Sequence, residues 1–258
     1  MKERLLVLAK AAPVQSSKYR YLVCVAGITE SGEWRRVYPV PWEVFSGKSK
    51  NKFMKKQWIE YELVEDKSPD GRPESRKIKK HSIVPLHHEN YKSIKKMLED
   101  KLTNMEILQN KKRQECSLGV VKPSIIKDIV WMDREVLSND DTKVQLTLDG
   151  TEVINLEPLD KKFQYHFKCS STCPTEHKIM CEDWKIEELY RKLKKKYNVD
   201  KACNLVKNKF LNEIYYKDHT YFIVGTHHRW NTWLIVSVVY PKKKDLNVLA
   251  MKSLDEFM

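Results

Sequence analysis

Short apolar runs separated by turn residues dominate the first third of the chain. Residues 5–9 and 21–28 are continuous apolar runs of strand length, as expected for buried strands. Residues 57–64 alternate apolar and polar side chains, which is typical of a strand with one buried face. Residues 34–41 follow a predicted hairpin turn at 30–33 and interleave cations with aromatic rings. This spacing of short strands predicts a β-rich unit that curls into a small barrel.

The pattern changes near residue 90. Tyr91, Ile94 and Leu98 begin an apolar series at helical spacing that extends to about residue 108, and it predicts a helical insertion at about 89–113. Two more strands are predicted beyond it, at 124–131 and 144–148. Turn residues and a Glu-Pro-Leu-Asp segment near residue 157 then mark a boundary.

The last hundred residues predict a compact arrangement of strands and helices. Two apolar stripes at helical spacing, at 184–197 and 200–214, predict amphipathic helices, and Asp200 is a potential N-cap of the second. Strand-like runs are found at 162–168, 221–224 and 233–240. The sequence therefore predicts an α+β protein in two parts. A β-rich, barrel-like domain at residues 1–156 carries the helical insertion, and a smaller α+β domain occupies residues 157–258.

Composition narrows the class of protein. The chain has 258 residues, of which 41% are hydrophobic, so it can bury a sizeable core and does not resemble a disordered chain. No apolar run approaches the ~20 residues needed to span a bilayer. The apolar stretch at residues 5–9 is too short for the core of a signal peptide. These features predict a cytoplasmic protein without membrane contact, in which cysteines stay reduced.

The formal net charge is +13. An excess of this size favours association with polyanions, because cations that contact phosphates release the counterions bound there. A solvated lysine-rich surface is the alternative interpretation, since such surfaces also reflect genome composition or growth at high temperature. The charge alone leaves both interpretations open.

Four side chains that can bind metal recur at even spacing, with three residues between each one and the next: Cys169, Cys173, His177 and Cys181. Three thiolates and one imidazole suit tetrahedral Zn²⁺ and leave no position for a substrate, so the set predicts a structural zinc site. A helix that starts near Pro174 would place His177 and Cys181 four residues apart on one face. The alternatives are scattered reduced cysteines or a single disulfide.

Arginine and aromatic side chains in three segments are candidates for nucleic-acid contact. Arginine forks bind phosphates in a bidentate manner, and Trp or Tyr rings stack on bases. Ordinary packing of the rings in a core, with solvated arginines, is the alternative in each segment. The candidate binding residues are Trp34, Arg35, Arg36, Tyr38, Arg72, Arg76, Arg229 and Trp230.

Catalytic candidates are fewer. His227 and His228 lie between two strong strand patterns and titrate near neutrality, which suits general acid–base chemistry. Glu74, in a glycine- and proline-containing loop, or Asp183 would supply a carboxylate. The chain has no phosphate-binding loop, no G-x-G-x-x-G and no G-x-S-x-G nucleophile motif.

Several of these segments together resemble a poorly characterised prokaryotic protein family without an established activity. The resemblance is carried by residues 34–41 (WRRVYPVP), 72–75 (RPES), 117–119 (SLG), and the Cys…Cys-x₃-His segment that runs into Asp183-Trp184. Cys181 is not part of that family pattern. The N-terminal part is also similar, at the level of fold alone, to PUA-like and ASCH-like barrels that bind RNA or modified bases, but it lacks their G-x-K-x-x-E-x-R pattern.

Three functions follow as hypotheses. The leading one is a cytoplasmic nucleic-acid-binding protein, in which a zinc-stapled C-terminal domain supports loops that contact DNA or RNA. The second is a nuclease or phosphodiesterase that uses His227 or His228 with Glu74 or Asp183. The third is an accessory subunit whose basic and aromatic surface contacts a protein partner.

Overall fold

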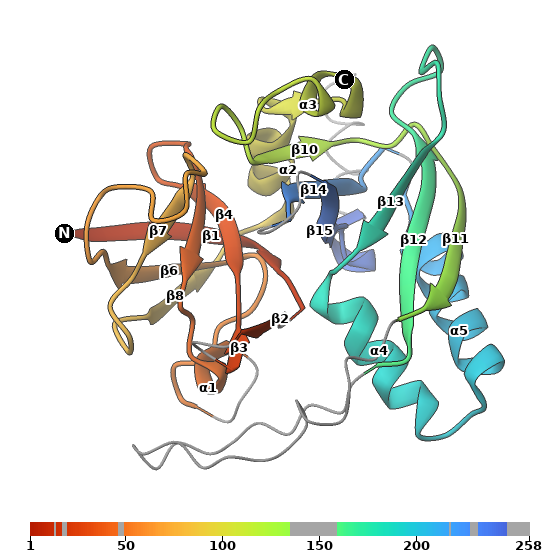
Figure 1. Cartoon of the computed structure of the whole chain (residues 1–258), viewed down its shortest axis with the longest axis horizontal. Coiled ribbons are helices and arrows are strands. Elements are labelled where there is room, and N and C mark those ends of the chain that lie inside the picture. The colour runs from red at the N-terminus through yellow and green to blue at the C-terminus, as the bar shows by residue number, and fades with distance from the viewer. Residues whose placement is uncertain are drawn as a thin grey trace, which may run out of the picture.

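The computed structural model describes residues 1–12, 14–16, 20–45, 49–134, 159–216, 218–227 and 232–246. It is a mixed α+β structure in which strands predominate, arranged as two sheets that lie side by side (Figure 1). This confirms the predicted α+β class. The predicted boundary at residues 156/157 and the predicted strand at 144–148 lie outside the described residues.

The first sheet has six strands in the order β7-β5-β4-β1-β6-β8. Neighbours pair antiparallel except β5 and β7, which are parallel. The predicted barrel does not close within the described residues; one isolated bridge, Leu63 to Ile78, links the residues that follow β6 and β7. Its strands are β1 (Lys2–Lys10), β4 (Val25–Thr29), β5 (Trp34–Tyr38), β6 (Gln57–Glu62), β7 (Ser75–Lys77) and β8 (Val84–His88).

The second sheet has seven strands in the order β11-β12-β13-β15-β14-β10-β9. Pairing is parallel between β13 and β15 and between β9 and β10, and antiparallel elsewhere. Its strands are β9 (Leu102–Thr103), β10 (Leu118–Val121), β11 (Ile125–Asp133), β12 (Lys161–Lys168), β13 (His177–Cys181), β14 (Tyr221–Thr226) and β15 (Trp233–Val239). A small hairpin of β2 (Val14–Ser16) and β3 (Arg20–Leu22) stands apart.

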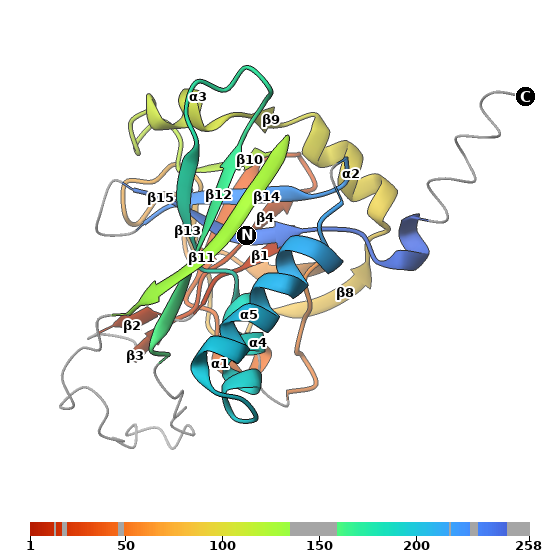
Figure 2. The same cartoon turned by 90° about the vertical axis from the view of Figure 1, so that its right-hand side faces the viewer.

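Helices cover the sheets where the sequence has amphipathic stripes. Helix α4 (Trp184–Lys194), capped by Asp183, and α5 (Val199–Asn208), capped by Asn198, each bury one face in the apolar cluster of the second sheet. Tyr190 of α4 contacts Phe163 of β12, and α5 lies beside β11 (Figure 2). The π-helix η2 (Lys209–Glu213) continues from α5. The remaining helices are α1 (Trp42–Phe45), α2 (Tyr91–Glu99) and α3 (Met105–Gln109).

Two predictions for these helices need correction. The single helix expected at residues 90–108 is divided into α2 and α3, because Leu102–Thr103 pairs with β10 and Asn104 caps a new helix through Ile107 N–H. The cap of α5 is Asn198, whose side chain accepts from Lys201 N–H, and not Asp200.

One apolar cluster joins the two sheets. Leu6 and Leu8 of β1 pack with Val120 of β10 and Ile223 of β14, and α2 contributes Ile94. All five side chains have no exposed surface. Burial of this kind, at roughly 25 cal/mol per Å² of apolar surface, holds the sheets together as one body.

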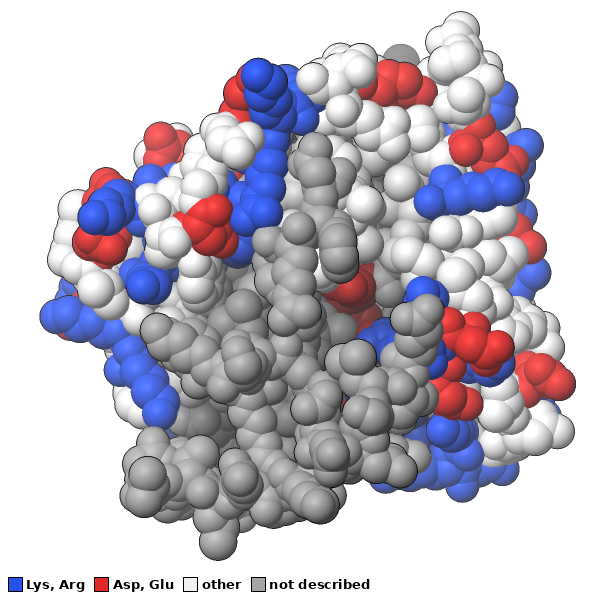
Figure 3. Space-filling model, viewed as in Figure 1, with Lys and Arg blue, Asp and Glu red and all other residues white. Residues whose placement is uncertain are grey.

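Charged side chains of both signs are interspersed on the face seen in Figure 3. Within the described residues, none of the helices is long and apolar enough to cross a membrane.

Candidate functional site

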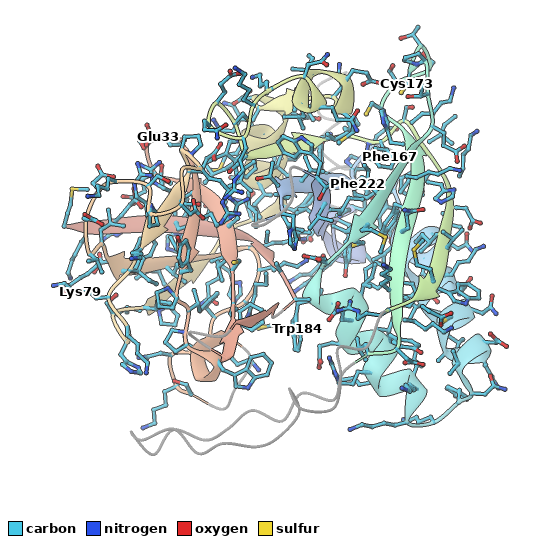
Figure 4. All side chains as sticks on the ribbon, in the orientation of Figure 1. Glu33, Lys79, Phe167, Cys173, Trp184 and Phe222 are labelled. Atoms are coloured by element: carbon cyan, nitrogen blue, oxygen red, sulfur yellow. The ribbon has the colours of Figure 1, made fainter. Side chains whose placement is uncertain are left out.

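Four potential metal ligands converge at one end of the β12–β13 hairpin: Glu106, Cys169, Cys173 and His177. The hairpin register places Phe167 opposite His177, so the connecting segment, which contains Cys169 and Cys173, lies at the end of the hairpin where β13 begins. Figure 4 shows Cys173 at the tip, with Phe167 further into the core. Glu106 arrives from the first turn of α3. One donor atom from each side chain lies within 4.8 Å of all the others.

The donor atoms already contact one another. Cys173 Sγ lies 2.9 Å from Glu106 Oε1 and 3.2 Å from His177 Nε2, and these two atoms are 3.0 Å apart. Cys169 Sγ accepts a hydrogen bond of 3.4 Å from Met105 N–H. Cys173 and His177 are both 5% exposed. Sulfur, imidazole nitrogen and carboxylate oxygen are all donors that zinc accepts, so this cluster could hold a metal ion.

Electrostatics at the cluster favour a cation. Burial raises the pKa of the Cys169 thiol to about 12. Burial also opposes ionisation of Glu106, but hydrogen bonds from Cys173, from the backbone and from His177, with the charge of His177, together outweigh that effect and lower the pKa of the carboxyl. A divalent cation would supply the positive charge that converts the thiols to thiolate ligands.

Cys181, the fourth predicted ligand, is not part of this cluster. The predicted helix after Pro174 is wrong, because residues 177–181 form the extended strand β13. A strand rises about 3.3 Å per residue, so Cys181 lies about 13 Å along it from His177. It pairs with Phe163 and is buried in the core, where burial raises the pKa of its thiol.

Glu106 occupies the place that the sequence assigned to Cys181. It lies 67 positions before Cys173, and a single acid in the first turn of a short helix carries no spacing signal. Only the tertiary arrangement, in which α3 packs beside the hairpin turn, identifies it.

Three of the predicted binding or catalytic residues join the two sheets instead of facing solvent. Arg36 of β5 is 4% exposed and donates to Ser117 Oγ at 2.9 Å and Ser117 O at 3.1 Å. Glu74 accepts from Ser117 N–H at 2.9 Å and from the Ser117 hydroxyl. Arg72 donates to Thr226 O at 3.3 Å and to Asp70. We call Arg36, Asp70, Arg72, Glu74 and Ser117 the polar latch.

The latch brings together three motifs that are distant in sequence: Arg36 from 34–41, Arg72 and Glu74 from 72–75, and Ser117 from 117–119. Desolvation, with repulsion from Arg72, lowers the pKa of Arg36 to about 10.

The other predicted binding residues are partly buried or paired. Arg35 contacts Glu3 and Glu33, and Arg76 contacts Asp66. Trp34 packs against the apolar cluster between the sheets, and Tyr38 is 9% exposed. Nucleic-acid contact by these side chains stays a prediction.

The segment between β14 and β15 is only partly described. His227 lies after β14 and its N–H donates to Thr232 O at 2.9 Å. His228, Arg229 and Trp230 lie outside the described residues.

A second charged cluster, which the sequence did not reveal, lies where the sheets meet. Its members come from β1, from the segment before β6, from α4 and from the chain after β15, and each interacts electrostatically with others of the set. We call them the junction lysines: Lys10, Lys52, Lys55, Lys56, Lys185 and Lys242.

The junction lysines divide into an inner and an outer group. Lys55 Nζ lies 2.6 Å from Asp183 Oδ2 and 2.8 Å from Ser237 Oγ, and its side chain is 6% exposed. Lys10 is 6% exposed, donates to Phe53 O at 3.0 Å, and lies 4.3 Å from the Phe45 ring centroid. Lys56 lies over Tyr91. The outer group, Lys52, Lys185 and Lys242, is exposed.

Positive charge exceeds negative charge in this cluster. The carboxylate of Asp245 acts on Lys56 and that of Asp183 acts on Lys185, while the charges that act on Lys10 are those of Lys52, Lys55 and Lys185. Desolvation, followed by repulsion from neighbouring lysines, lowers the pKa of Lys10 to about 7. Desolvation also lowers the pKa of Lys56 to about 8, where Lys185 and Lys55 act against the attraction of Asp245.

Comparison with known proteins gives families without a described activity. Residues 1–103 match the family model described as domain of unknown function DUF8758. No curated protein matches. Among solved structures, the chain matches one described as "Structure of murine DNA binding protein bound with ds DNA"; it is 11% identical, the match covers 94% of this chain and 97% of that chain, and the TM-score is 0.31. A TM-score this low does not indicate a common fold.

The expected resemblance to a poorly characterised family is thereby confirmed. Residues 100–256 match a second model, which covers more than half of the chain and includes all four side chains of the candidate metal cluster, and the protein therefore belongs to the family described as domain of unknown function DUF8757.

Proposed function

We propose that the protein binds nucleic acid through phosphate contacts at the junction lysines. The observation that carries the proposal is the convergence of six lysines from four segments, of which Lys10, Lys56 and Lys185 are each repelled by other lysines of the set. The overall charge of +13 adds a long-range attraction of the same sign.

The two groups of lysines have different parts in this proposal. The exposed ammonium groups of Lys52, Lys185 and Lys242 are the ones that contact phosphate oxygens. The inner group raises the local positive potential in a region of low dielectric, where each charge acts more strongly than in water. A bound phosphate relieves the repulsion that lowers the pKa of Lys10 and Lys56. Lys185 also lies in the first turn of α4, where the helix dipole attracts anions.

A structural Zn²⁺ at Glu106, Cys169, Cys173 and His177 is the second part of the proposal. Four protein donors fill a tetrahedral shell and leave no open position, as in structural sites. The ion would fix α3 to the β12–β13 hairpin. The described cysteines are all free thiols, which suits a reducing, cytoplasmic setting.

The test is a salt-titrated binding series by fluorescence anisotropy with labelled DNA and RNA 20-mers. We expect log K to fall linearly with log[salt]. Charge reversal of Lys52, Lys185 and Lys242 to Glu should weaken binding and reduce the magnitude of the salt slope by about 2–3, or roughly one per phosphate contact.

The matched control reverses Lys192, Lys195 and Lys196, three exposed lysines at and beyond the end of α4. It changes the net charge by the same amount away from the junction. Equal losses in the two variants would show that charge acts without a defined site. Absence of binding to any DNA or RNA would refute the proposed function.

A further inference from the structure

Three aromatic rings meet beside the junction lysines, and we call them the aromatic triad: Trp42 and Phe45 of α1, and Trp184 of α4. The Trp42 and Trp184 ring centroids are 5.3 Å apart with the rings perpendicular. Phe45 lies 5.7 Å from Trp184 and 5.8 Å from Trp42, nearly parallel to the latter. Figure 4 places Trp184 where α4 approaches α1.

The triad and the lysines are in direct contact. Phe45 O accepts a hydrogen bond from Lys10 Nζ, which also lies over the Phe45 ring. Trp184 immediately precedes Lys185, one of the three exposed junction lysines. The triad therefore lies beside the junction lysines, joined to them in space through Lys10 and along the chain through Lys185. In a nucleic acid, a base likewise lies beside its own phosphates.

The three rings differ in exposure. Phe45 has no exposed surface and Trp184 is 8% exposed. Trp42 is only partly buried and packs at the margin of its apolar cluster. The guanidinium of Arg191 lies 5.4 Å from the Trp184 ring centroid, so Trp184 is also held on its α4 side. Two buried rings thus hold Trp42 in a fixed orientation, and Trp42 is the ring of the triad that a ligand can reach.

We infer that Trp42 stacks on an unpaired base whose flanking phosphates are bound by the junction lysines, so the preferred ligand is single-stranded nucleic acid. This inference rests on the proposed function. In a duplex, the faces of the bases are covered by their neighbours and an exposed tryptophan cannot reach them without unstacking. In a single strand every base presents a face, and stacking on an aromatic side chain combines with backbone contacts without requiring a particular sequence.

The test compares three 20-mers with the full-length protein: a thymidine oligomer, a wholly abasic oligomer with the same phosphates, and a blunt duplex. Stacking of one base on an aromatic side chain typically changes affinity by about 5- to 100-fold. We expect the wild-type protein to bind the thymidine oligomer tighter than the abasic one by a factor in that range. Trp42→Ala should remove that difference and leave duplex and abasic binding unchanged, and Trp42→Phe should retain part of it.

Trp131→Ala is the control for loss of a partly buried tryptophan, because Trp131 lies on β11 at the edge of the second sheet. Equal wild-type affinity for the thymidine and abasic oligomers would overturn the inference even if Trp42→Ala failed to fold. The same result with lysine-dependent binding to all three oligomers would leave the proposed function intact. Failure of all three to bind would refute the proposed function itself.

Discussion

Replacement of Asp183 by Ala is the change for which the structure gives the largest expected loss of stability. Asp183 has no exposed surface and connects three parts of the junction. Its carboxylate lies 2.6 Å from Lys55 Nζ and accepts from Val238 N–H at 2.7 Å. It also caps α4 by accepting from Lys185 N–H at 2.9 Å.

The magnitude follows from the contacts that are lost. Breaking a buried ion pair by removal of one partner costs about 3–5 kcal/mol, because the remaining charge is left uncompensated. Loss of an Asp N-cap costs about 1 kcal/mol. The two losses add to about 4–6 kcal/mol, and because they share one carboxylate this sum is the upper limit of the expected fall in the free energy of unfolding. For a chain of this length that corresponds to a Tm lower by about 10–20 °C.

The assay is thermal and urea unfolding followed by circular dichroism, with two companion variants. Asp183→Asn keeps a good cap and removes only the charge, so it should lose about 3 kcal/mol. Asp133→Asn removes an ion pair with Lys161 in which the Asp133 side chain is 88% exposed. It should change the free energy of unfolding by less than about 1 kcal/mol. If Asp183→Ala unfolds no earlier than Asp133→Asn, the junction does not depend on this ion pair and the reasoning fails.

Three further predictions concern the metal cluster, the inner lysines and the latch. Glu106→Ala should lower the amount of bound zinc, measured by elemental analysis, and should lower the Tm. Cys181→Ser should leave the zinc content unchanged. Loss of zinc in Cys181→Ser alone would favour the ligand set predicted from the sequence. Because the folded-state pKa of Lys10 is about 7 against 10.5 for the free side chain, the unfolded chain binds more protons between these values and stability should rise with pH there. The slope from Lys10 approaches about 1.4 kcal/mol per pH unit, and Lys10→Met should abolish that part of it in urea titrations at several pH values. Arg36→Met should lower the unfolding free energy by about 3 kcal/mol, since the half-buried Glu74 loses a neighbouring cation and Ser117 loses its hydrogen-bond donor. An unchanged free energy in urea unfolding would show that Glu74 does not need the charge of Arg36.

Local patterns predicted the elements that bury one regular face. β12 alternates buried Phe163, Tyr165 and Phe167 with partly exposed residues, and the stripe of α4 matches its buried Ile186 and Tyr190. In both cases the period of the apolar residues is the period of the element. For these two elements the local sequence was therefore enough to predict the secondary structure.

The error at residues 177–181 has a different origin. Buried His177, Ile179 and Cys181 alternate with Lys178 and Met180, which is the period of a strand. The helical interpretation rests on the spacing of the metal ligands, whereas the hydrophobic alternation predicts the strand correctly. By contrast, no local pattern could have identified Glu106 as a potential ligand. Its position beside Cys173 depends on the pairing of β9 with β10 and on the start of α3 directly after β9.

The two polar clusters between the sheets, the polar latch and the junction lysines, differ in their balance of positive and negative charge. In the polar latch Arg72 pairs with Asp70, and Arg36 and Glu74 both bind Ser117 and attract each other, so two positive and two negative charges lie together within the protein. Lys10, Lys56 and Lys185 of the junction are instead each repelled by other lysines of the set, and the carboxylates that act on Lys56 and Lys185 are those of Asp245 and Asp183. Desolvated like charges raise the free energy of the folded state unless an anion joins them. The arginine motif therefore joins the two sheets, whereas in the proposed function the lysines, scattered along the sequence, form the site that would bind an anionic ligand.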